Sequence, residues 1–265
     1  MSAPSASAVV PPSSSRPVAL VTGAGKRIGR AIAEGLAADG FAVALHVNTA
    51  RAEAEALARE IEAQGGTAAV VAGDLTDPDR PARLMAEAAD ALGPVRLLVN
   101  SASIFEKDEI GTLTPALFDA HYAIHTRAPA FLAQEMAARL PDGDTGLIVN
   151  VIDQRVWKLT PQFFSYTLSK AALWTATRTM AQALAPRIRV NAIGPGPTLA
   201  NTRQQPEDFE KQAARVPLGR GPGLAEFPRT VRFLWDTPSI TGQMIALDGG
   251  QHLAWETPDV VGIAE

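Results

Sequence analysis

The chain has 265 residues, of which 46% are hydrophobic and 20% charged, and its formal net charge is −4. This acidic balance gives no support for a nucleic-acid or anionic-membrane surface, because both need a basic field. Cysteine is absent, which excludes disulfides and thiolate catalysis, and the four histidines lack metal-ligand spacing, so we expect no metal site.

The N-terminal residues 1–16 are rich in Ser, Ala and Pro, and we interpret them as a disordered segment. They lack the basic start and long apolar stretch of a secretory signal. No apolar run in the chain reaches the roughly 18 residues of a membrane span. We therefore expect a cytoplasmic protein without membrane association, folded as a single domain over residues 17–265.

Strand and helix patterns alternate from residue 17 onward. Short apolar runs predict strands at residues 18–21, 41–47, 67–71, 96–99, 146–151, 187–192 and 244–247. Amphipathic spacing predicts helices at 28–38, 51–64 and 81–92, with two long helices on either side of the fifth strand. This alternation indicates an α/β fold of Rossmann type, a doubly wound parallel sheet of about seven strands with helices on both faces.

One segment departs from the alternation. Residues 195–223 are rich in Pro, Gly, Gln and Arg and lie between the last two predicted strands. Long irregular segments inside compact domains are often lids or binding loops. We expect this one to be a loop that closes over the substrate.

The first predicted strand ends in a glycine-rich turn, residues 22–29 (TGAGKRIG). Glycines let the backbone turn sharply and approach a pyrophosphate, and the N-terminus of the following helix offers free N–H groups. The turn therefore predicts a nucleotide site, with packing alone as the alternative explanation of its glycines.

This turn resembles the TGxxxGxG motif of the short-chain dehydrogenases/reductases, and the resemblance extends over residues 17–250. Arg27 stands where the family has its middle glycine, and the resemblance places it with Lys26 near the adenosine end of the cofactor. A guanidinium suits a phosphate, and residues 46–51 offer no Asp or Glu for a free ribose 2′-hydroxyl. We therefore expect NADP(H) rather than NAD; alternatively, Arg27 and Arg51 are solvated surface charges.

The resemblance implies further cofactor contacts where successive strands end. Asp74-Leu75 matches the family's adenine contact, residues 100–103 (NSAS) resemble its NNAG segment, and Pro195-Gly196 resembles its nicotinamide-side turn. The predicted cofactor-binding residues are Gly23, Lys26, Arg27, Ile28, Gly29, Asn48, Thr49, Asp74, Leu75, Asn100, Ala102, Ser103, Tyr166, Lys170, Pro195 and Gly196.

The catalytic residues are predicted from a YxxxK spacing, Tyr166 and Lys170. Residues four apart lie on one face of a helix, so Lys170 can sit beneath the phenol. We expect the cation to lower the pKa of Tyr166 toward working pH and to make it a general acid. The alternative is an exposed helical pair.

Asp153 occupies the place where the family usually has a serine. A carboxylate suits an amidine- or guanidine-like N–H ring and can relay a proton; alternatively, the enzyme is divergent or inactive. Asp153, the YxxxK pair and Arg27 together resemble the pteridine reductases and the related dihydromonapterin/dihydrofolate reductases of the family. The resemblance implies that Phe105 stacks on the pterin ring, unless it is a core residue.

His125 replaces the asparagine that the family uses in a water-mediated proton relay, as in the dihydromonapterin reductase branch. A histidine can relay protons near neutral pH, or it can serve helix packing. We therefore predict Asp153, Tyr166, Lys170 and His125 as catalytic residues, and Phe105, Asp153 and Tyr166 as substrate-binding residues.

The expected function is NADPH-dependent hydride transfer to a C=N bond of a dihydropterin, dihydromonapterin or dihydrofolate, a small-molecule substrate. One alternative is a carbonyl reductase acting on a 3-ketoacyl thioester, a sugar or another ketone. Another is a non-catalytic NADP-binding sensor, although the intact tyrosine and lysine argue against it. The family resemblance implies a homo-oligomer, a tetramer or a dimer.

Overall fold

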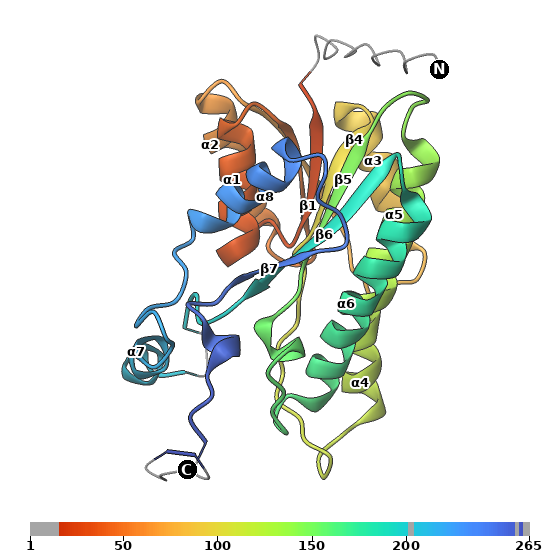
Figure 1. The fold of residues 1–265 in the computed structure, drawn as a ribbon. Coiled ribbons are helices and arrows are strands. Elements are labelled where there is room, and N and C mark those ends of the chain that lie inside the picture. Colours follow the sequence, from red (N-terminus) through yellow and green to blue (C-terminus); the bar gives the residue numbers. More distant parts are fainter. Residues whose placement is uncertain (1–15, 201–203, 258–259, 262–265) are drawn as a thin grey trace, which may run out of the picture.

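The computed structural model describes residues 16–200, 204–257 and 260–261. Nearly all of the predicted N-terminal segment lies outside the described residues. Seven parallel strands form one sheet in the order β3-β2-β1-β4-β5-β6-β7 (Figure 1). They are β1 (Val18–Thr22), β2 (Ala42–Val47), β3 (Thr67–Ala72), β4 (Val95–Asn100), β5 (Gly146–Val151), β6 (Ile188–Pro195) and β7 (Met244–Leu247). The predicted doubly wound sheet is confirmed.

Helices cover both faces of the sheet. On one face lie α1 (Arg27–Ala38), α2 (Arg51–Ala63) and α8 (Glu226–Asp236), and on the other α3 (Arg80–Leu92), α5 (Ala128–Arg139) and α6 (Phe164–Leu184). Because strands β1, β2 and β5 are buried along their whole length, their sequences are mostly apolar rather than alternating, with Thr22, His46 and Asn150 as polar residues near their carboxyl ends.

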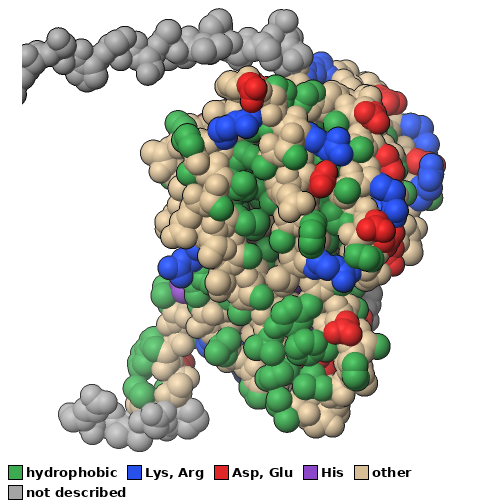
Figure 2. Space-filling view, turned by 90° about the vertical axis from the view of Figure 1, so that its right-hand side faces the viewer, with side chains coloured by type: hydrophobic (Ala, Val, Ile, Leu, Met, Phe, Trp, Pro, Cys, Tyr) green, Lys and Arg blue, Asp and Glu red, His purple; other side chains and the backbone are tan. Residues whose placement is uncertain are grey.

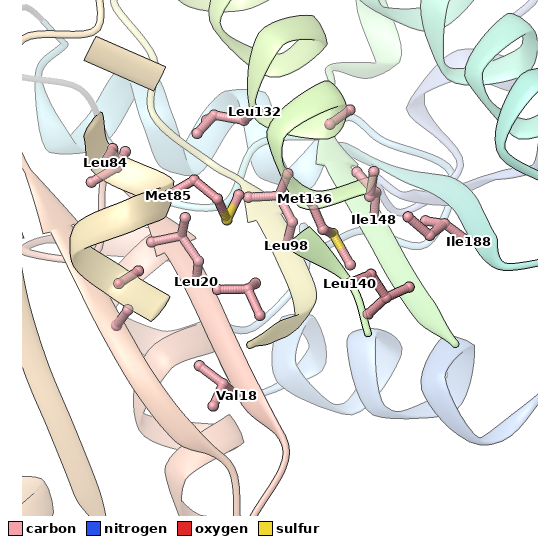
Figure 3. Packing of buried hydrophobic residues seen from close by; sticks show 14 of the residues in the cluster. Val18, Leu20, Leu84, Met85, Leu98, Leu132, Met136, Leu140, Ile148 and Ile188 are labelled. Carbon is pink, nitrogen blue, oxygen red and sulfur yellow. The ribbon is translucent and has the colours of Figure 1, made fainter. Parts of the chain in front are cut away.

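The hydrophobic core has one large cluster on each side of the sheet. On the first side, Leu36 of α1 and Phe227 of α8 are fully buried against strand residues. On the second, Leu84 of α3 and Met136 of α5 pack against Leu98 and other residues of the central strands (Figure 3). The two clusters fix the sheet, and the strand ends carry the loops that concern function.

Three helical elements differ from the expectation. The helix predicted before β5 is divided into α4 (Pro115–Tyr122), a π-helical turn η1 (Ala123–Arg127) and α5. The predicted loop 195–223 contains α7 (Pro206–Ala214), which buries no residue, so no apolar periodicity marks it. Helix α8 was not predicted, although Phe227, Val231 and Leu234 form its buried face.

All seven strands are parallel, so their carboxyl ends lie along one edge of the sheet, the lower edge in Figure 1. In the sheet, β1 lies between β2 and β4, so the strand order reverses at this point. In sheets of this kind, ligands usually bind at the carboxyl ends of the strands beside such a reversal. Within the described part of the chain, no helix is both long and apolar enough to cross a membrane.

Candidate active site

The glycine turn after β1 forms a close-packed cradle. Gly23 has φ 70°, and a Cβ added there would lie 2.9 Å from the Cα of Ala102. A Cβ at Gly29 would lie 2.2 Å from the carbonyl oxygen of Gly23. Ile28 lies between them in the first turn of α1 and packs against the core. Only glycine fits at these two places, as a turn that brings backbone close to a phosphate requires.

Arg27 and Lys26 diverge from each other. Arg27 adopts φ 55°, in the left-handed region, and its guanidinium donates to the carbonyl oxygens of Leu199 and Ala200, at 3.0 and 2.8 Å. Lys26 instead pairs with Glu53, in the first turn of α2 (Arg51–Ala63), at 2.8 Å. Arg27 thus reaches the segment after β6, and the placement of both cations at the adenosine end of the cofactor stays a prediction.

The cradle is held to neighbouring strand ends by side chains that the sequence did not single out. Thr22 Oγ1 accepts from the backbone N–H groups of Ser101 and Ala102. His46 Nδ1 accepts from the N–H of Gly23, while its Nε2 lies 2.9 Å from the carbonyl of Gly73. Burial lowers the pKa of His46 to about 4, so the ring is neutral and Nε2–H donates.

Asn100 ends β4 next to this cradle. Its amide nitrogen donates to Asn150 Oδ1 at 2.8 Å, but its own Oδ1 is buried without a hydrogen-bond partner among the described residues. A buried acceptor without a donor is costly. A hydroxyl or amide of a ligand in the cradle can supply that donor, so the residues present fit a bound dinucleotide.

The other predicted cofactor residues lie along the same edge. Asn48 and Thr49 are exposed directly after β2, Leu75 is buried after β3, and Asp74 accepts from the N–H of Thr76. Pro195 ends β6, and a Cβ at Gly196 would lie 2.6 Å from the Cα of Asp248. The structure thus brings the predicted strand-end residues to one edge.

Asp153, Tyr166 and Lys170 come together between β5 and α6. The Tyr166 hydroxyl donates to Asp153 Oδ2 at 3.0 Å. Lys170 Nζ donates to the carbonyl of Val151 at 2.8 Å and lies 5.8 Å from the centroid of the Tyr166 ring. Lys170 is buried, so the pair is not an exposed helical pair.

The electrostatics of this group differ from the prediction. Burial, together with the Asp153 carboxylate that accepts its hydrogen bond, raises the pKa of Tyr166 well above 10. The expectation that Lys170 lowers this pKa is wrong for the protein alone, because burial of the phenol and the Asp153 carboxylate at its hydroxyl both raise it. Burial also raises the pKa of Asp153 and lowers that of Lys170 to about 8. Tyr166 is therefore a protonated phenol at neutral pH.

His125 lies in the π-helical turn η1, beside the ring of Tyr166 at a centroid distance of 5.2 Å. Its Nε2 accepts from the N–H of Ile104 and lies 2.9 Å from Ser103 Oγ. Its Nδ1 lies 2.8 Å from Ser169 Oγ, which itself donates to the Tyr166 carbonyl. Burial lowers the pKa of His125 well below 6.5, so a neutral ring with Nδ1–H links the loop after β4 to α6.

Phe105 lies in an aromatic group at the start of α6. Its ring stacks on Phe163 at 4.2 Å and meets the Tyr166 ring edge-to-face at 4.8 Å. The Arg155 guanidinium lies 5.6 Å from the Phe105 centroid and 5.0 Å from that of Phe163. Phe105 thus borders Tyr166, and its stacking on a substrate ring stays a prediction.

The loop between β4 and α4, which carries Phe105 and is called the Phe105 loop below, is fixed to α6 by a buried polar group. The sequence analysis did not predict this group. Ser165 Oγ donates to the Asp108 carboxylate, and the Ser165 N–H donates to Asp108 Oδ1 at 3.1 Å. His121 Nδ1 lies 2.6 Å from Ser165 Oγ. All three residues are fully buried. Because they lie at distant places in the chain, no spacing pattern connects them.

No group of three or more His, Cys, Asp or Glu among the described residues could hold a metal ion.

Several known proteins are similar to this chain over most of its length. A family model described as short chain dehydrogenase matches residues 17–211. L-xylulose reductase from Bos taurus is 33% identical over 240 residues, which cover 88% of this chain and 95% of the relative. The NADPH-dependent aldehyde reductase-like protein, chloroplastic, from Arabidopsis thaliana is 32% identical over 251 residues, covering 88% of this chain and 93% of the relative.

Two solved structures are similar over most of the chain. FolM alternative dihydrofolate reductase 1 from Brucella canis, complexed with NADP, has a TM-score of 0.90 and 60% identity, covering 92% of this chain and 97% of that one. A blue fluorescent protein from a metagenomic library, in complex with NADPH, has a TM-score of 0.83 and 32% identity, covering 89% and 98%.

Proposed function

The chain belongs to the short-chain dehydrogenase family, and on this premise we propose that it is an NADPH-dependent reductase of a C=N bond in a pterin-type substrate. The substrate is a dihydropterin, dihydromonapterin or dihydrofolate. The observation that carries the proposal is the hydrogen bond between Tyr166 and Asp153, which puts a carboxylate where a ketone reductase of the family has a serine hydroxyl.

The cofactor is proposed to be NADP(H), which is the ligand of the neighbouring structures. Gly23 and Gly29 leave room for the pyrophosphate, and the buried Oδ1 of Asn100 can accept a hydrogen bond from the bound dinucleotide. When bound, the cofactor supplies the hydride. Lys26, the N-cap residue of α1, pairs with Glu53 in the first turn of α2 and is proposed as a cation for the 2′-phosphate, with Arg27 beside it in the turn.

The protein residues divide the remaining work. Tyr166 is a protonated phenol and gives a proton to the nitrogen beside the reduced carbon. Asp153 orients the substrate ring by accepting hydrogen bonds from its N–H groups. It also exchanges a proton with Tyr166 through the hydrogen bond between them. Phe105 provides a flat face for the heterocycle.

Two residues are proposed to support this group. Lys170 is held by the Val151 carbonyl beneath the Tyr166 ring, where its charge favours proton transfer. His125 is proposed to act through position, because its ring nitrogens bind the loop after β4 and the start of α6. A relay of protons through His125 stays a prediction.

A carbonyl reductase is the second candidate. It is favoured by the names of the relatives, an aldehyde reductase-like protein and L-xylulose reductase. The carboxylate of Asp153 opposes it, because a carboxylate repels the oxyanion that forms from a ketone. The intact Tyr166 and Lys170 give no support to a non-catalytic sensor.

The exposed face that carries α5 and α6 supports an assembly of more than one copy. Figure 2 shows hydrophobic side chains at several places on this side of the molecule. Phe131 of α5 and Leu168 of α6 are 46% and 37% exposed. A dimer or a tetramer, and a cytoplasmic location, stay predictions from the family resemblance.

The test is NADPH oxidation with dihydropterin, dihydrofolate and a 3-ketoacyl substrate side by side, with wild type and Asp153→Ser. Turnover on a pterin that the variant loses is the expected result. Turnover on the ketone alone would remove the pterin proposal and leave the family chemistry of Tyr166 and Lys170.

A further inference from the structure

Two parallel aromatic rings lie beside the candidate acid–base group. The rings of Phe105 and Phe163 have centroids 4.2 Å apart and planes inclined by 5°. A flat heterocycle stacked on Phe105 would lie at a similar separation and tilt, because offset stacking is a preferred arrangement of flat rings. One face of the ring proposed to bind the substrate is therefore already covered by another ring of the protein.

Tyr166 is covered by side chains on several sides, and its exposed fraction is only 5%. The rings of His121 and His125, which are both fully buried, meet it edge-to-face at centroid distances of 5.9 and 5.2 Å. The Phe105 ring meets it at 4.8 Å and is itself only half-buried. A substrate that takes a proton from Tyr166 must therefore approach on the side of Phe105, which is also the side of Phe163.

Of the two stacked rings, Phe105 is on the better-held segment. Just before it, the N–H of Ile104 donates to His125 Nε2 at 3.3 Å. Just after it, Asp108 accepts from the N–H of Ser165 at 3.1 Å. The Phe105 loop is thus tied to buried residues on both sides of the ring, and we expect Phe105 to keep its position.

The segment before Phe163 is held only locally. Residues 158–162 are all exposed. Among the described residues, their hydrogen bonds stay within the stretch 154–162: Arg155 donates to Thr160 Oγ1 at 3.2 Å, and Thr160 Oγ1 donates to the carbonyl of Gln162 at 3.1 Å. Exposed segments with few contacts open at low free energy. Phe163, at the end of this segment, is therefore the ring of the pair that can move.

The backbone of Phe163 favours such a movement. Phe163 is the N-cap residue of α6, and its φ of 57° and ψ of 50° lie in the left-handed region. This region is unfavourable for a bulky residue, and N-cap residues ordinarily have extended backbone. Rotation of Phe163 into the extended region would relieve this strain and carry the ring away from Phe105. Strain of this kind is concentrated at sites that change conformation in function.

We propose that the Phe163 ring holds the place of the substrate ring on Phe105, and that the substrate binds by displacing it. This inference rests on the proposed function and locates the substrate ring within it. A pterin has two fused rings and so a larger stacking face than the single ring that it replaces, and it also donates to Asp153. Loss of the Phe105–Phe163 stack is a cost that every substrate meets on entry.

The experiment measures kcat and KM for 7,8-dihydrobiopterin at saturating NADPH. Phe163→Ala and Phe163→Leu both remove the flat ring, and Phe163→Leu keeps most of its bulk. Both are expected to lower KM by about threefold at a kcat within about twofold of wild type, because no stack has to be broken. Phe163→Tyr keeps a flat ring and should keep the wild-type KM. A higher KM in Phe163→Ala and Phe163→Leu would make Phe163 a wall of the substrate site, and an unchanged KM would make it a packing residue; either result overturns the displacement.

A double variant and a matched control test the partner of Phe163. Phe105→Ala/Phe163→Ala should have the same KM as Phe105→Ala, since the stack is absent from both. A further fall in the double variant would show that Phe163 acts on something other than Phe105. The control is Phe118→Ala, which removes one ring from the stacked pair of Phe118 and Tyr122 in α4. A fall in KM of the same size in this control would show a general loosening, and would overturn the displacement as well.

The two proposals can fail separately. If wild type reduces a 3-ketoacyl substrate and no dihydropterin, the proposed function is wrong. The same variants then test the displacement on the ketone, for which KM should again fall by about threefold, because any substrate of Tyr166 meets the same stack. If wild type reduces neither, fluorescence titration with 6-methylpterin decides. A Kd about threefold lower in Phe163→Leu than in wild type supports the displacement, and equal or weaker binding, or none, overturns it.

Discussion

The Tyr166 hydroxyl donates a 3.0 Å hydrogen bond to the Asp153 carboxylate. This contact connects the first turn of α6 to the segment that follows β5. Burial raises the pKa of Tyr166, and the Asp153 carboxylate raises it further, because a phenolate beside a carboxylate would be repelled by it. The contact also makes the proton on Tyr166 available to a substrate that Asp153 orients.

Replacing Asp153 by Asn should therefore lower the pKa of Tyr166 toward 10. The chain has two tyrosines, so tyrosinate absorbance during a pH titration can be assigned by subtracting a Tyr166→Phe sample. The same variant should lose about a hundredfold in kcat on a dihydropterin, the size of a general acid–base contribution. An unchanged titration curve would show that Asp153 does not control the phenol.

The activity of the enzyme should fall at alkaline pH because Lys170 loses its proton there. Burial lowers the pKa of this lysine to about 8, so its charge is lost as pH rises through that value. If the charged form assists Tyr166, kcat/KM falls over the same range. Lys170→Arg keeps its charge there and should remove the falling limb, even if its overall rate is lower. A wild-type profile that is flat through pH 8 would contradict this role.

The same group predicts how stability changes with pH. The native state releases the lysine proton near pH 8, and the unfolded chain releases it near 10.5. Between these values the unfolded state binds more protons, so the free energy of unfolding contributed by this group rises with pH. The urea midpoint of wild type, relative to that of Lys170→Met, should therefore rise as pH increases across this range. A parallel course of the two would exclude the linkage.

Phe105 should matter for binding more than for chemistry. Removal of a stacking ring costs about 0.5–1.5 kcal/mol beyond its buried area, so Phe105→Ala should raise KM for a dihydropterin by about threefold to tenfold. Phe118→Ala is the control, because Phe118 stacks on Tyr122 in α4 rather than on Tyr166. Steady-state kinetics with equal KM for both variants would make Phe105 a core residue.

Local patterns predicted the parts of the site that are close in sequence. The glycine turn joins two consecutive elements, β1 and α1, and the YxxxK pair lies within α6, so spacing alone places their residues together. The direction of the Tyr166 pKa was predicted wrongly because spacing shows Lys170 one helical turn away. It does not show that Asp153, from another element, reaches the hydroxyl.

Arg27 and α7 show the same limit. The motif position of Arg27 predicts a cation in the turn, but its contacts with Leu199 and Ala200 depend on how the chain after β6 returns to α1. Helix α7 begins with Pro206 and has Glu207 and Asp208 in its first turn, which favour a helix start. Its lack of buried residues removed the periodicity by which helices are recognised.

The last prediction concerns Asp108, whose role is visible only in three dimensions. Its buried carboxylate accepts from the N–H and the hydroxyl of Ser165 and so fixes the Phe105 loop to the first turn of α6. Hydrogen bonds to a buried charged group contribute about 1.5–3 kcal/mol each. Asp108→Asn removes the charge and turns one acceptor into a donor that faces the Ser165 N–H or hydroxyl. The free energy of unfolding should fall by about 2 kcal/mol, seen as a lower urea midpoint at unchanged slope.

The matched control for Asp108→Asn is Asp142→Asn, on an exposed turn before β5, which should leave the urea midpoint within about 0.5 kcal/mol of wild type. Loosening of the Phe105 loop should also raise KM for a dihydropterin in Asp108→Asn, at a temperature where the variant is fully folded. If that variant unfolds at the wild-type urea concentration, the Asp108–Ser165 contact does not hold the loop. If it is destabilised but keeps the wild-type KM, the contact supports the fold and not the substrate face of Phe105.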